Sequence, residues 1–380
     1  MLVLLSMLQF CLIVAVVVYL AVNAHFLVKL EPTAGPLTAS PRVSVCVPAR
    51  NEERDLEACL VSLLNQDYPH FEVIVVDDNS TDRTPEIIES LKERYPNLIT
   101  VRGAELPPDW YGKPFALHQA VQNSRGDILL FTDADPVFQP NALRTAVGEM
   151  QNHSLDMLTL LPAAEFGSFW ERTVQPLIFA FIAALAQFGK VNDPESEAAM
   201  GIGAFLMIRR EVYDRVGGHA SLKQVILEDI GMGRLLKQAG ARIRIAHGQE
   251  IYSIRMYHSL KEIWMGWRKN IFLALNKSVV KTFYYIFWVL GFVVTPWLLG
   301  AYHGIQGSSG WLLGLSLIGL FLVGITHATL CHELKLQQRY AYLFPLGALV
   351  MAAVMINSML HLLLHGHAEW RGRTYSQPVR

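Results

Sequence analysis

The sequence predicts an α/β domain with a mainly parallel sheet, flanked by apolar segments long enough to cross a membrane. Short β-rich runs alternate with helical runs after Arg42, and this alternation is typical of parallel sheets with right-handed crossovers. No Asp, Glu, Lys or Arg precedes Lys29 in the chain of 380 residues. A second apolar region begins after Lys281 and contains none of these charged residues before Glu333.

The composition agrees with a membrane protein that carries a sizeable polar domain. Hydrophobic residues make up 52% of the chain, charged residues make up 17%, and mean hydropathy is +0.28, which is more apolar than an ordinary soluble enzyme. The formal net charge of -1 provides no global basic field, so nucleic acid is not an expected partner. The four cysteines are scattered without a C-x-x-C spacing, which argues against a disulfide framework or a zinc site.

The apolar segments predict one N-terminal and about three C-terminal transmembrane helices. Residues 2–23 are long enough to span a bilayer. A cleaved signal peptide would carry a basic start and a shorter apolar core, so we expect an uncleaved anchor over residues 1–28. In the region 282–366, "YYIFWVLGFVVTPWLLGAY" and "WLLGLSLIGLFLVGITHATL" predict two spans, and residues 341–364 predict a third.

The placement of lysine and arginine predicts the orientation of these spans. Basic residues follow the first span and precede the second, whereas the loop at 303–310 has none. The positive-inside rule therefore predicts that residues 30–282 lie in the cytoplasm and that the N-terminus lies outside. Four spans would also place the basic tail 367–380 outside, although it carries three arginines. One C-terminal segment could be re-entrant instead, and the sequence leaves this open.

The elements of the polar domain follow from their patterns in order. "RVSVCVP" predicts a first strand, and "EERDLEACLVSLLNQ" predicts a helix with four leucines on one face: Leu56, Leu60, Leu63 and Leu64. "FEVIVVDD" is near-continuously apolar, as in a sheet covered on both faces. Thr84 and Pro85 predict an N-cap and first helical position, with the helix reaching about Tyr95. "NLITVR" predicts a third strand, 114–124 a helix and "DILLFT" a fourth strand.

Polar clusters follow three of these strands. They are "PARNE", "DDNSTD" and the pair Asp133 and Asp135, and parallel sheets bind ligands beyond the carboxyl ends of their strands. Neither a G-x-G-x-x-G nor a Walker lysine loop is present. An acidic edge can still bind a nucleotide diphosphate, because a divalent cation takes carboxylate and phosphate oxygens together. We therefore predict Mg²⁺ or Mn²⁺ at Asp133 and Asp135; the alternative is an ordinary polar loop.

The segment from "VSVCVPARNEERDLEACL" to "VVDDNSTDRTPEII" resembles the opening of family 2 glycosyltransferases with the GT-A fold. "GDILLFTDADPVF" resembles their metal-binding D-x-D, and "GIGAFLMIRREVYDRVGGH" with "ILEDIGMGRLLKQAG" resembles their acceptor half. The resemblance covers about residues 42–275. The apolar helices and the tail "WRGRTY" are similar to membrane-anchored members that act on lipids, including ceramide glucosyltransferases and bacterial carotenoid- and hopanoid-associated transferases. This implies a bacterial-type inner or plasma membrane location with a cytoplasmic catalytic domain.

The resemblance also implies residue roles for the donor. The residues that would line the nucleoside pocket are Pro48, Arg50, Asn51 and Glu52. Asp78, together with Asp77, would contact the base or ribose. The alternative for Asp77 is a structural role, in which it only caps its turn. Lys113 in "WYGKPFALHQA" matches a family lysine near the diphosphate, and the alternative is a solvated loop lysine. The metal at Asp133 and Asp135 would stabilise the leaving diphosphate as a Lewis acid.

The "ED" pair, Glu228 and Asp229, carries the implied catalytic step. By resemblance, Asp229 is the general base that takes the proton from the acceptor hydroxyl as its oxygen attacks the anomeric carbon. One direct displacement inverts the anomeric configuration. The alternative is a structural role, because acidic residues are favoured at helix N-termini without any catalysis.

Two apolar or aromatic segments each allow two interpretations. "EIWMGWRKN" lacks the Q-x-x-R-W of processive polysaccharide synthases; its Trp267 and Arg268 could contact the diphosphate, or belong to a membrane-surface helix. Residues 169–188 are apolar, but Pro176 interrupts them. We expect an interfacial helix beside the acceptor site there, with a core helix as the alternative.

The leading hypothesis is an inverting, metal-dependent transfer of one sugar from a nucleotide sugar to a membrane lipid. The resemblance to the family implies UDP as the nucleotide. A processive polysaccharide synthase and a polyprenyl-phosphate sugar transferase are the alternative enzymes. An inactive lipid-binding membrane scaffold is the alternative of another class. The sequence leaves open the sugar, the lipid, the choice of Mg²⁺ or Mn²⁺, and the oligomeric state.

Overall fold

The computed structural model describes residues 2–30, 37, 39–307 and 310–376. The chain divides into two compact units. The sheet unit comprises Phe26–Glu165 and Ala186–Met256, and the helical unit comprises Met1–His25, Phe166–Leu185 and Tyr257–Arg380. The predicted domain over residues 42–275 is a different division and stays a prediction.

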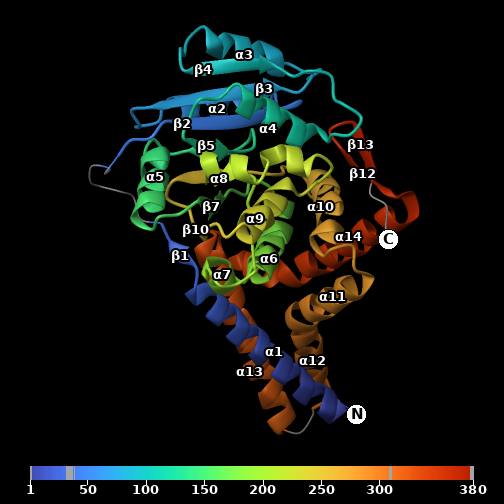
Figure 1. Ribbon diagram of the computed structural model, residues 1–380. Helices are drawn as coiled ribbons and strands as arrows, with labels where there is room; N and C mark the ends of the chain where they lie inside the picture. Colours follow the sequence, from blue (N-terminus) through green and yellow to red (C-terminus); the bar gives the residue numbers. More distant parts are fainter. Residues whose placement is uncertain (1, 31–36, 38, 308–309, 377–380) are drawn as a thin grey trace. The chain divides into compact units, whose positions relative to one another are not determined.

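The sheet unit is built on an eight-stranded sheet with the order β1-β10-β7-β9-β5-β2-β3-β4 (Figure 1). Its strands are β1 (Val28–Lys29), β2 (Val43–Ala49), β3 (Phe71–Asp77), β4 (Leu98–Arg102), β5 (Ile128–Phe131), β7 (Met157–Leu161), β9 (Leu206–Arg209) and β10 (Ile243–His247). Only β9 runs antiparallel to its neighbours, β5 and β7. The prediction of a mainly parallel sheet is therefore confirmed.

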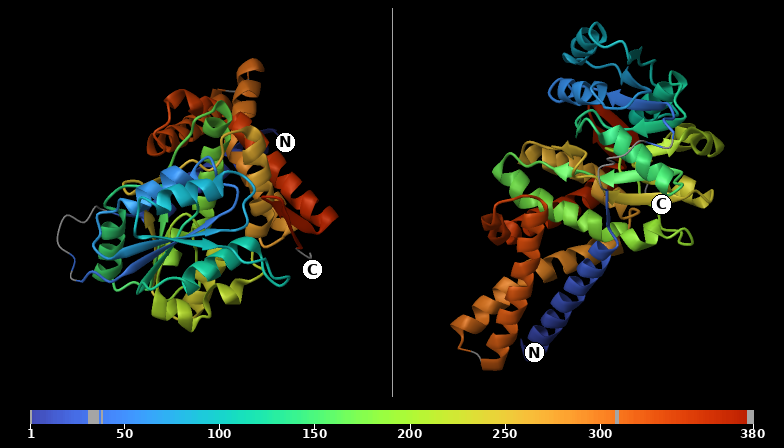
Figure 2. Two further views of the ribbon diagram at one scale, coloured as in Figure 1. Left: turned by 90° about the horizontal axis from the view of Figure 1, so that it is seen from above. Right: turned by 90° about the vertical axis from the view of Figure 1, so that its left-hand side faces the viewer.

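Helices cover both faces of this sheet. Figure 2 shows α2 (Leu56–Leu64) and α3 (Thr84–Lys92) on one face and α4 (Gly112–Gln122) on the other. Six of the seven residues of β2 are buried, because alternate side chains point to opposite faces and both faces are covered. The leucine face predicted for α2 is buried in the core.

The remaining elements of the sheet unit are short. The helices are α5 (Ala142–Asn152), α7 (Phe188–Asn192), α8 (Arg210–Arg215), η1 (Gly218–Leu222) and α9 (Glu228–Gln238). A three-stranded sheet pairs β6 (Val137–Phe138), β11 (Tyr252–Ile254) and β8 (Ala163–Ala164) in the order β6-β11-β8.

The start of α3 differs from the prediction by one residue. The helix begins at Thr84 itself, and Pro85 is its second residue. The Asp82 Oδ1 atom accepts a hydrogen bond from the Thr84 amide (3.0 Å), whereas the Thr84 hydroxyl oxygen accepts from the Glu52 amide (2.8 Å). The threonine side chain therefore holds the loop after β2 and does not cap its own helix.

The helical unit contains the predicted apolar helices. They are α1 (Leu2–His25), α6 (Phe169–Ala186), α10 (Leu260–Ala274), α11 (Val279–Val293), α12 (Thr295–Ile305), α13 (Gly310–Glu333), η2 (Gln338–Leu343) and α14 (Phe344–His365). Among the described residues, four helical segments are long and apolar enough to cross a membrane: Val3–His25, Phe169–Ala186, Gly310–Glu333 and Gln338–His365. The pair α11 and α12 is bent by 43°, as in a broken span or a re-entrant loop.

Helix α6 covers all but the last two residues of the segment 169–188 in which we expected a helix. It runs unbroken from Phe169 to Ala186 with Pro176 inside. At its start, both carboxylate oxygens of Glu171 accept hydrogen bonds from the amides of Gly167 and Ser168 (2.7 Å each). These contacts satisfy donors that a helix N-terminus leaves free, which explains why a fully buried glutamate is tolerated there.

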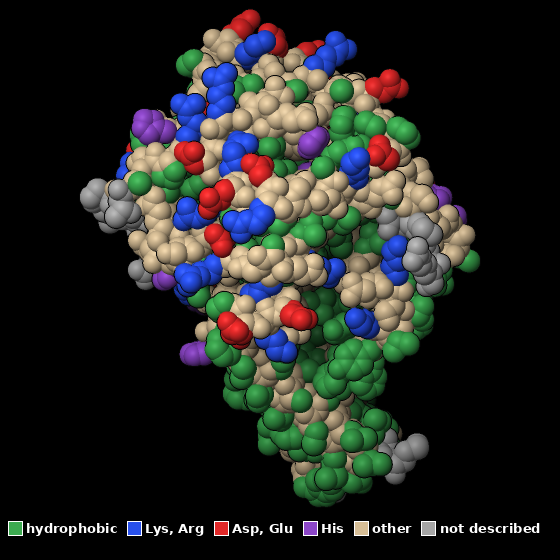
Figure 3. All heavy atoms as spheres, viewed as in Figure 1, with side chains coloured by type: hydrophobic (Ala, Val, Ile, Leu, Met, Phe, Trp, Pro, Cys, Tyr) green, Lys and Arg blue, Asp and Glu red, His purple; other side chains and the backbone are tan. Residues whose placement is uncertain are grey.

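Large apolar side chains are exposed along α1, α12 and α13. Figure 3 shows hydrophobic side chains gathered on the surface of these helices. Leu4 is 62% exposed, Leu298 is 63% exposed and Phe321 is 66% exposed. Contiguous exposed apolar surface marks contact with a membrane or a partner. Helices α1 and α13 have the length and composition for a membrane, and α12 has them only together with α11.

The chain ends in a hairpin that the sequence did not predict. Strands β12 (His367–Trp370) and β13 (Arg373–Ser376) pair antiparallel. The two residues between them, Arg371 and Gly372, have φ angles of 48° and 76°, as in the two-residue turns that join hairpin strands. Residues 377–380 of the predicted basic tail lie outside the described residues.

Candidate active site

The loops after β2 and β3 are tied together at the carboxyl edge of the sheet. The Arg50 guanidinium donates hydrogen bonds to the backbone carbonyls of Asp78 (2.6 Å) and Asn79 (3.1 Å). The Asn51 Oδ1 atom accepts from the Thr81 amide (2.8 Å). Asn51 and Asn79 have φ angles of 54° and 55°, a region that asparagine enters more readily than most residues. The two loops therefore form one polar edge.

The predicted nucleoside residues all lie on this edge. Pro48 is in β2 and Glu52 follows it, while Asp77 ends β3. The Asp77 Oδ1 atom accepts a hydrogen bond from the Ser80 amide (3.0 Å), which is the turn-forming role given as the alternative. Asp78 is buried, with an exposed fraction of 4%. Contact of these residues with a nucleoside stays a prediction.

Lys113 joins the two acidic motifs. It lies in the first turn of α4, and its Nζ atom is 2.6 Å from Asp133 Oδ1 and 2.7 Å from Glu228 Oε1. Burial alone would lower the pKa of this lysine, but the charges of Asp133, Glu228 and Asp229 outweigh it and raise the pKa well above its ordinary value. Lys113 is therefore a charged bridge between the motifs, although its side chain is 34% exposed.

Asp229 is held by two backbone amides. The Gly203 amide donates to Asp229 Oδ2 (2.8 Å), and the Ile230 amide donates to Asp229 Oδ1 (2.8 Å). Burial, and secondly the charge of Glu228, raise the pKa of Asp229 to about 6, against the opposing effect of Lys113. A carboxylate with this pKa is charged at neutral pH and is basic enough to take a proton in a transition state.

The residue that these side chains surround is Gly203, which the sequence did not single out. A Cβ atom on Gly203 would lie 2.9 Å from Lys113 Nζ, 3.3 Å from Asp229 Oδ2 and 3.4 Å from Asp133 Oδ2. Glycine is thus the residue that allows the lysine, the D-x-D and the "ED" pair to approach one another. Its signal in the sequence is the "GIG" of "GIGAF".

Asp135 fits a divalent cation. Its Oδ1 atom is buried and has no hydrogen-bond partner among the described residues. Burial raises the pKa of Asp135 well above its usual range, and the charges of Asp133, Glu52 and Asp55 raise it further. Within the described residues, no group of three or more His, Cys, Asp or Glu is placed to hold a metal ion. Mg²⁺ and Mn²⁺ suit two carboxylates that are completed by phosphate oxygens.

The family comparison agrees with this geometry. Residues 44–217 match the family model described as "Glycosyl transferase family 2". The chain contains a family 2 glycosyltransferase domain. The matched range holds Asp133, Asp135 and Lys113 of the candidate site, while Glu228 and Asp229 follow it.

Named glycosyltransferases are similar along most of the chain. The chain is 24% identical over 349 residues to the 4,4'-diaponeurosporenoate glycosyltransferase of Staphylococcus aureus (strain USA300), with 88% of each protein covered. It is 25% identical over 369 residues to the protein of the same name from Staphylococcus haemolyticus (strain JCSC1435), with 94% of each covered. Both identities are low, and both matches extend over the apolar helices as well as the glycosyltransferase domain.

A solved structure confirms the predicted GT-A fold. The mannosyltransferase PcManGT from Pyrobaculum calidifontis, solved in complex with GDP-Man and Mn²⁺, matches with a TM-score of 0.54 and 20% sequence identity. The match covers 96% of this chain and 98% of that chain.

Trp267 and Arg268 belong to the helical unit, apart from the other candidate residues of the glycosyltransferase domain. Trp267 is 5% exposed and meets the rings of Phe179 and Tyr257 edge-on. The Arg268 Nη2 atom is 3.5 Å from Glu369 Oε2. Their contact with the donor diphosphate stays a prediction, and the packing of Trp267 gives it a structural role.

Proposed function

We propose that this glycosyltransferase moves one sugar from a nucleotide sugar to a membrane lipid, with a divalent cation and with inversion at the anomeric carbon. Asp229 is the general base, Asp133 and Asp135 hold Mg²⁺ or Mn²⁺, and Lys113 and Glu228 form the ion pair between them. The domain faces the cytoplasm, in keeping with the basic residues on both sides of it.

The observation that carries the proposal is the convergence of opposite charges around Gly203. Lys113 pairs with Asp133 of the D-x-D and with Glu228 of the "ED" pair at 2.6 and 2.7 Å. The base and the metal-binding carboxylates therefore belong to one site, which is what a displacement at a sugar carbon between acceptor and diphosphate requires. A polar loop without function would not need a glycine between three charged groups, Lys113, Asp133 and Asp229.

The proposed reaction is a single displacement, and the positions of these residues are compatible with it. The acceptor hydroxyl gives its proton to Asp229 while its oxygen forms a bond to the anomeric carbon. The bond from that carbon to the diphosphate oxygen breaks, and the electron pair leaves with the nucleoside diphosphate. The two amides on Asp229 hold the carboxylate in place for this transfer. When bound, the metal would offset negative charge on the leaving diphosphate.

The lipid acceptor is supported by the helical unit and by the relatives. The exposed apolar surface of α1, α12 and α13 suits a bilayer, and the two staphylococcal relatives are named for 4,4'-diaponeurosporenoate, a carotenoid. Use of a nucleotide sugar and of Mn²⁺ is supported by the complex in which PcManGT was solved. The nucleotide base, the sugar and the lipid remain for the experiment to identify.

The test uses membranes that contain the full chain, a panel of labelled UDP- and GDP-sugars, Mg²⁺ or Mn²⁺, and a lipid extract. Thin-layer chromatography would follow the label, and Asp229→Asn and Asp135→Ala would be assayed alongside. We expect label in one discrete lipid, lost with EDTA and in both variants. Asp109→Asn is the matched control, because its carboxylate pairs with Lys223 (2.9 Å) at an exposed position.

Other outcomes would overturn the proposal. Label in long polymer would identify a processive synthase, and transfer that survives EDTA would exclude the metal. Retention of the anomeric configuration in the product would exclude a single displacement. No transfer from any donor by the folded protein would favour the membrane scaffold.

A further inference from the structure

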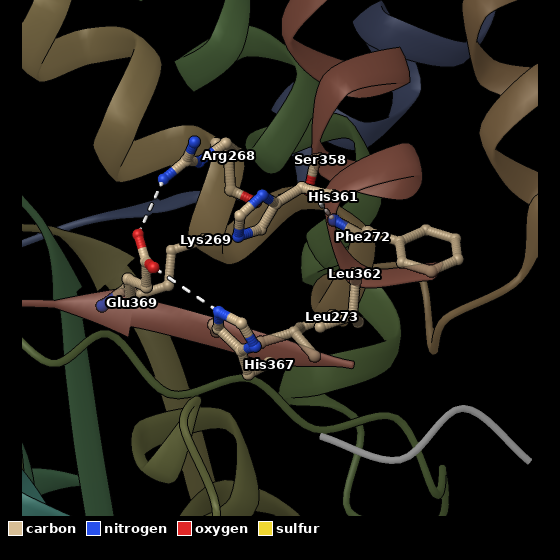
Figure 4. A pocket seen from close by; sticks show the side chains of 10 residues that line it. Arg268, Lys269, Phe272, Leu273, Ser358, His361, Leu362, His367 and Glu369 are labelled. Carbon is tan, nitrogen blue, oxygen red and sulfur yellow. Dashed lines mark hydrogen bonds and ion pairs between the residues drawn. The ribbon is translucent and has the colours of Figure 1, made fainter. Parts of the chain in front are cut away.

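A second polar site lies in the helical unit, and none of its residues belongs to the range 44–217 matched by the family model. A small pocket is formed by α10, the end of α14 and the strand β12, and its enclosed part has room for about one water molecule (Figure 4). Ten residues line it: Arg268, Lys269, Phe272, Leu273, Ser358, His361, Leu362, His367, Ala368 and Glu369. Nothing in the proposed transfer reaction uses this pocket, so its chemistry can be considered separately.

The polar side of the pocket carries more basic than acidic groups. Two cationic side chains, Arg268 and Lys269, and two histidines, His361 and His367, face a single carboxylate, Glu369. The Nε2 atom of His361 is buried and has no hydrogen-bond partner among the described residues. A buried polar atom without a partner is costly, and an anion in the pocket would supply one.

Glu369 acts as an internal anion, but it holds its place weakly. Its oxygens are 3.5 Å from Arg268 Nη2 and 3.4 Å from His367 Nε2, longer than the 2.7–2.9 Å of good charge-assisted hydrogen bonds. The Glu369 side chain is 50% exposed, against 22% for Arg268 and 31% for His367. The pocket therefore already accommodates a carboxylate at its mouth. Because the Glu369 carboxylate is half exposed and weakly held, it can move out into water at little cost.

The opposite side of the pocket is apolar and is formed by residues of α10 and α14. Phe272 and Leu362 are 1% and 4% exposed and form one hydrophobic cluster with Met359. On the outward face of α14, Leu363 is 42% exposed and Leu364 is 76% exposed. A ligand with an acidic head and a hydrocarbon chain would match both sides, because the segment Gln338–His365 is apolar enough for a membrane.

We propose that this pocket binds the carboxylate or phosphate head group of a membrane amphiphile, which displaces Glu369 from Arg268. The guanidinium of Arg268 suits either head group, since its fork of donors matches two oxygens. Arg268 then serves this anion and not the donor diphosphate.

The test is direct binding to the purified full-length protein in phosphatidylcholine nanodiscs without added nucleotide sugar. Fluorescent-labelled palmitate and phosphatidic acid are the two acidic probes, and labelled hexadecanol is the neutral probe of similar length. Arg268→Gln should weaken acidic binding about tenfold, the size of one lost charge-assisted bond. Glu369→Gln should strengthen it several-fold, because the internal competitor is removed.

The controls separate this site from general effects of charge and folding. Lys261→Gln removes one positive charge from the same helix but not from the pocket. This variant should bind the acidic probes with the same affinity as the unchanged protein. Opposite shifts for Arg268→Gln and Glu369→Gln cannot arise from partial unfolding. Preference for palmitate would assign a carboxylate head group, and preference for phosphatidic acid would assign a phosphate.

The proposal fails if hexadecanol binds as tightly as the acidic probes, or if neither variant changes their affinity. It also fails if inorganic phosphate competes as well as phosphatidic acid, because the hydrocarbon chain would then contribute nothing. Displacement of the acidic probes by UDP or GDP would assign Arg268 to the donor instead. Binding is measured without transfer, so failure here leaves the proposed glycosyltransferase reaction untouched.

Discussion

The sheet unit and the helical unit each contain a polar site, and the two sites have opposite charge patterns. In the sheet unit, one lysine, Lys113, lies among three carboxylates: Asp133, Glu228 and Asp229. In the helical unit, one carboxylate, Glu369, lies among arginine, lysine and histidine side chains. In each site, one side chain carries the charge opposite to that of its neighbours. The neighbours still leave an excess of charge, which indicates a ligand of the opposite sign.

The two internal counter-ions differ in how firmly they are held. The ion pairs of Lys113 are 2.6 and 2.7 Å long, whereas the contacts of Glu369 with Arg268 and His367 are 3.5 and 3.4 Å long. Lys113 is 34% exposed and Glu369 is 50% exposed. A short, less exposed pair maintains the geometry of a reaction site, while a long, exposed pair gives way to an incoming ligand.

The largest effect on activity is expected for a substitution in the sheet unit that removes a reacting group. Asp229→Asn removes the general base and should lower the rate of sugar transfer by about 10²–10⁴-fold. Initial rates with saturating donor and lipid measure this, and donor affinity should stay the same. A loss below tenfold, with Asp109→Asn fully active, would assign the base to another residue.

Gly203→Ala tests whether the convergence of charges needs an empty space. A Cβ atom would be 2.9 Å from Lys113 Nζ and 3.3 Å from Asp229 Oδ2, so the ion pairs must shift. We expect the transfer rate to fall by about 10–100-fold, since a small displacement of reacting groups is costly. Gly324→Ala is the control, because nothing lies within 4 Å of its added carbon. Equal activity of the two variants would contradict the prediction.

The pH dependence of transfer should reveal Asp229. Its pKa is raised from 3.8 to about 6, so the base becomes protonated as the pH falls through about 6. Below that value kcat/KM should drop about tenfold for each pH unit, and the residual rate of Asp229→Asn should lack this step. The raised pKa also means that the folded state binds this proton more tightly, so the group favours folding more as pH falls from about 6 towards 3.8. A flat profile between pH 5 and 7 would argue against Asp229 as the base.

Removing the two counter-ions compares their contributions to stability. Lys113→Gln leaves Asp133 and Glu228 without their partner and should lower the free energy of unfolding by about 1–3 kcal/mol. Glu369→Gln should change it by less than about 1 kcal/mol, because the pair is exposed. Denaturation of the purified protein without divalent metal measures both. A similar loss in the two variants would remove the distinction between firmly and weakly held counter-ions.

The smallest effect concerns the start of α10, the helix that carries Arg268. The Ser259 hydroxyl oxygen accepts from the Glu262 amide (3.2 Å), which makes Ser259 the N-cap of the helix, and Glu262 Oε2 accepts from the amide of the preceding residue, His258 (2.9 Å). Ser259→Ala should cost about 1 kcal/mol of stability. Ser259→Asp keeps an N-cap acceptor and should lose much less, as measured by the same denaturation experiment. Equal losses would show that the cap is not what the serine contributes.

The strands, the covering helices and the polar edge could be predicted from the sequence. Alternation of apolar runs fixed the order of β2, α2, β3 and α3, and parallel strands bring their carboxyl ends to one edge. The turn role of Asp77 was foreseen as an alternative, because aspartate commonly accepts hydrogen bonds from nearby amides. The start of α3 was misplaced by one residue, because Thr84 bonds to another loop and not to its own helix.

The relation of Gly203 to Lys113 and Asp229 could not be predicted from local patterns. It depends on β9, the one antiparallel strand of the large sheet, which pairs Leu206 with Phe131 and so brings Gly203 beside the D-x-D. The pocket in the helical unit depends likewise on Arg268 and Glu369, which are a hundred residues apart in the sequence. Such pairings are decided by tertiary packing, which no local period encodes.

If the C-terminal helices lie in a bilayer, the contact between Arg268 and Glu369 also constrains how the chain crosses it. Two groups in contact at a polar pocket lie in the same compartment, so the chain crosses the bilayer an even number of times between them. Three complete crossings by the C-terminal segments would separate the two residues. One segment must therefore turn back or lie along the surface, as the 43° bend between α11 and α12 allows. Arg371 and Arg373 then share a compartment with the basic residues of α10, which removes the conflict with the positive-inside rule.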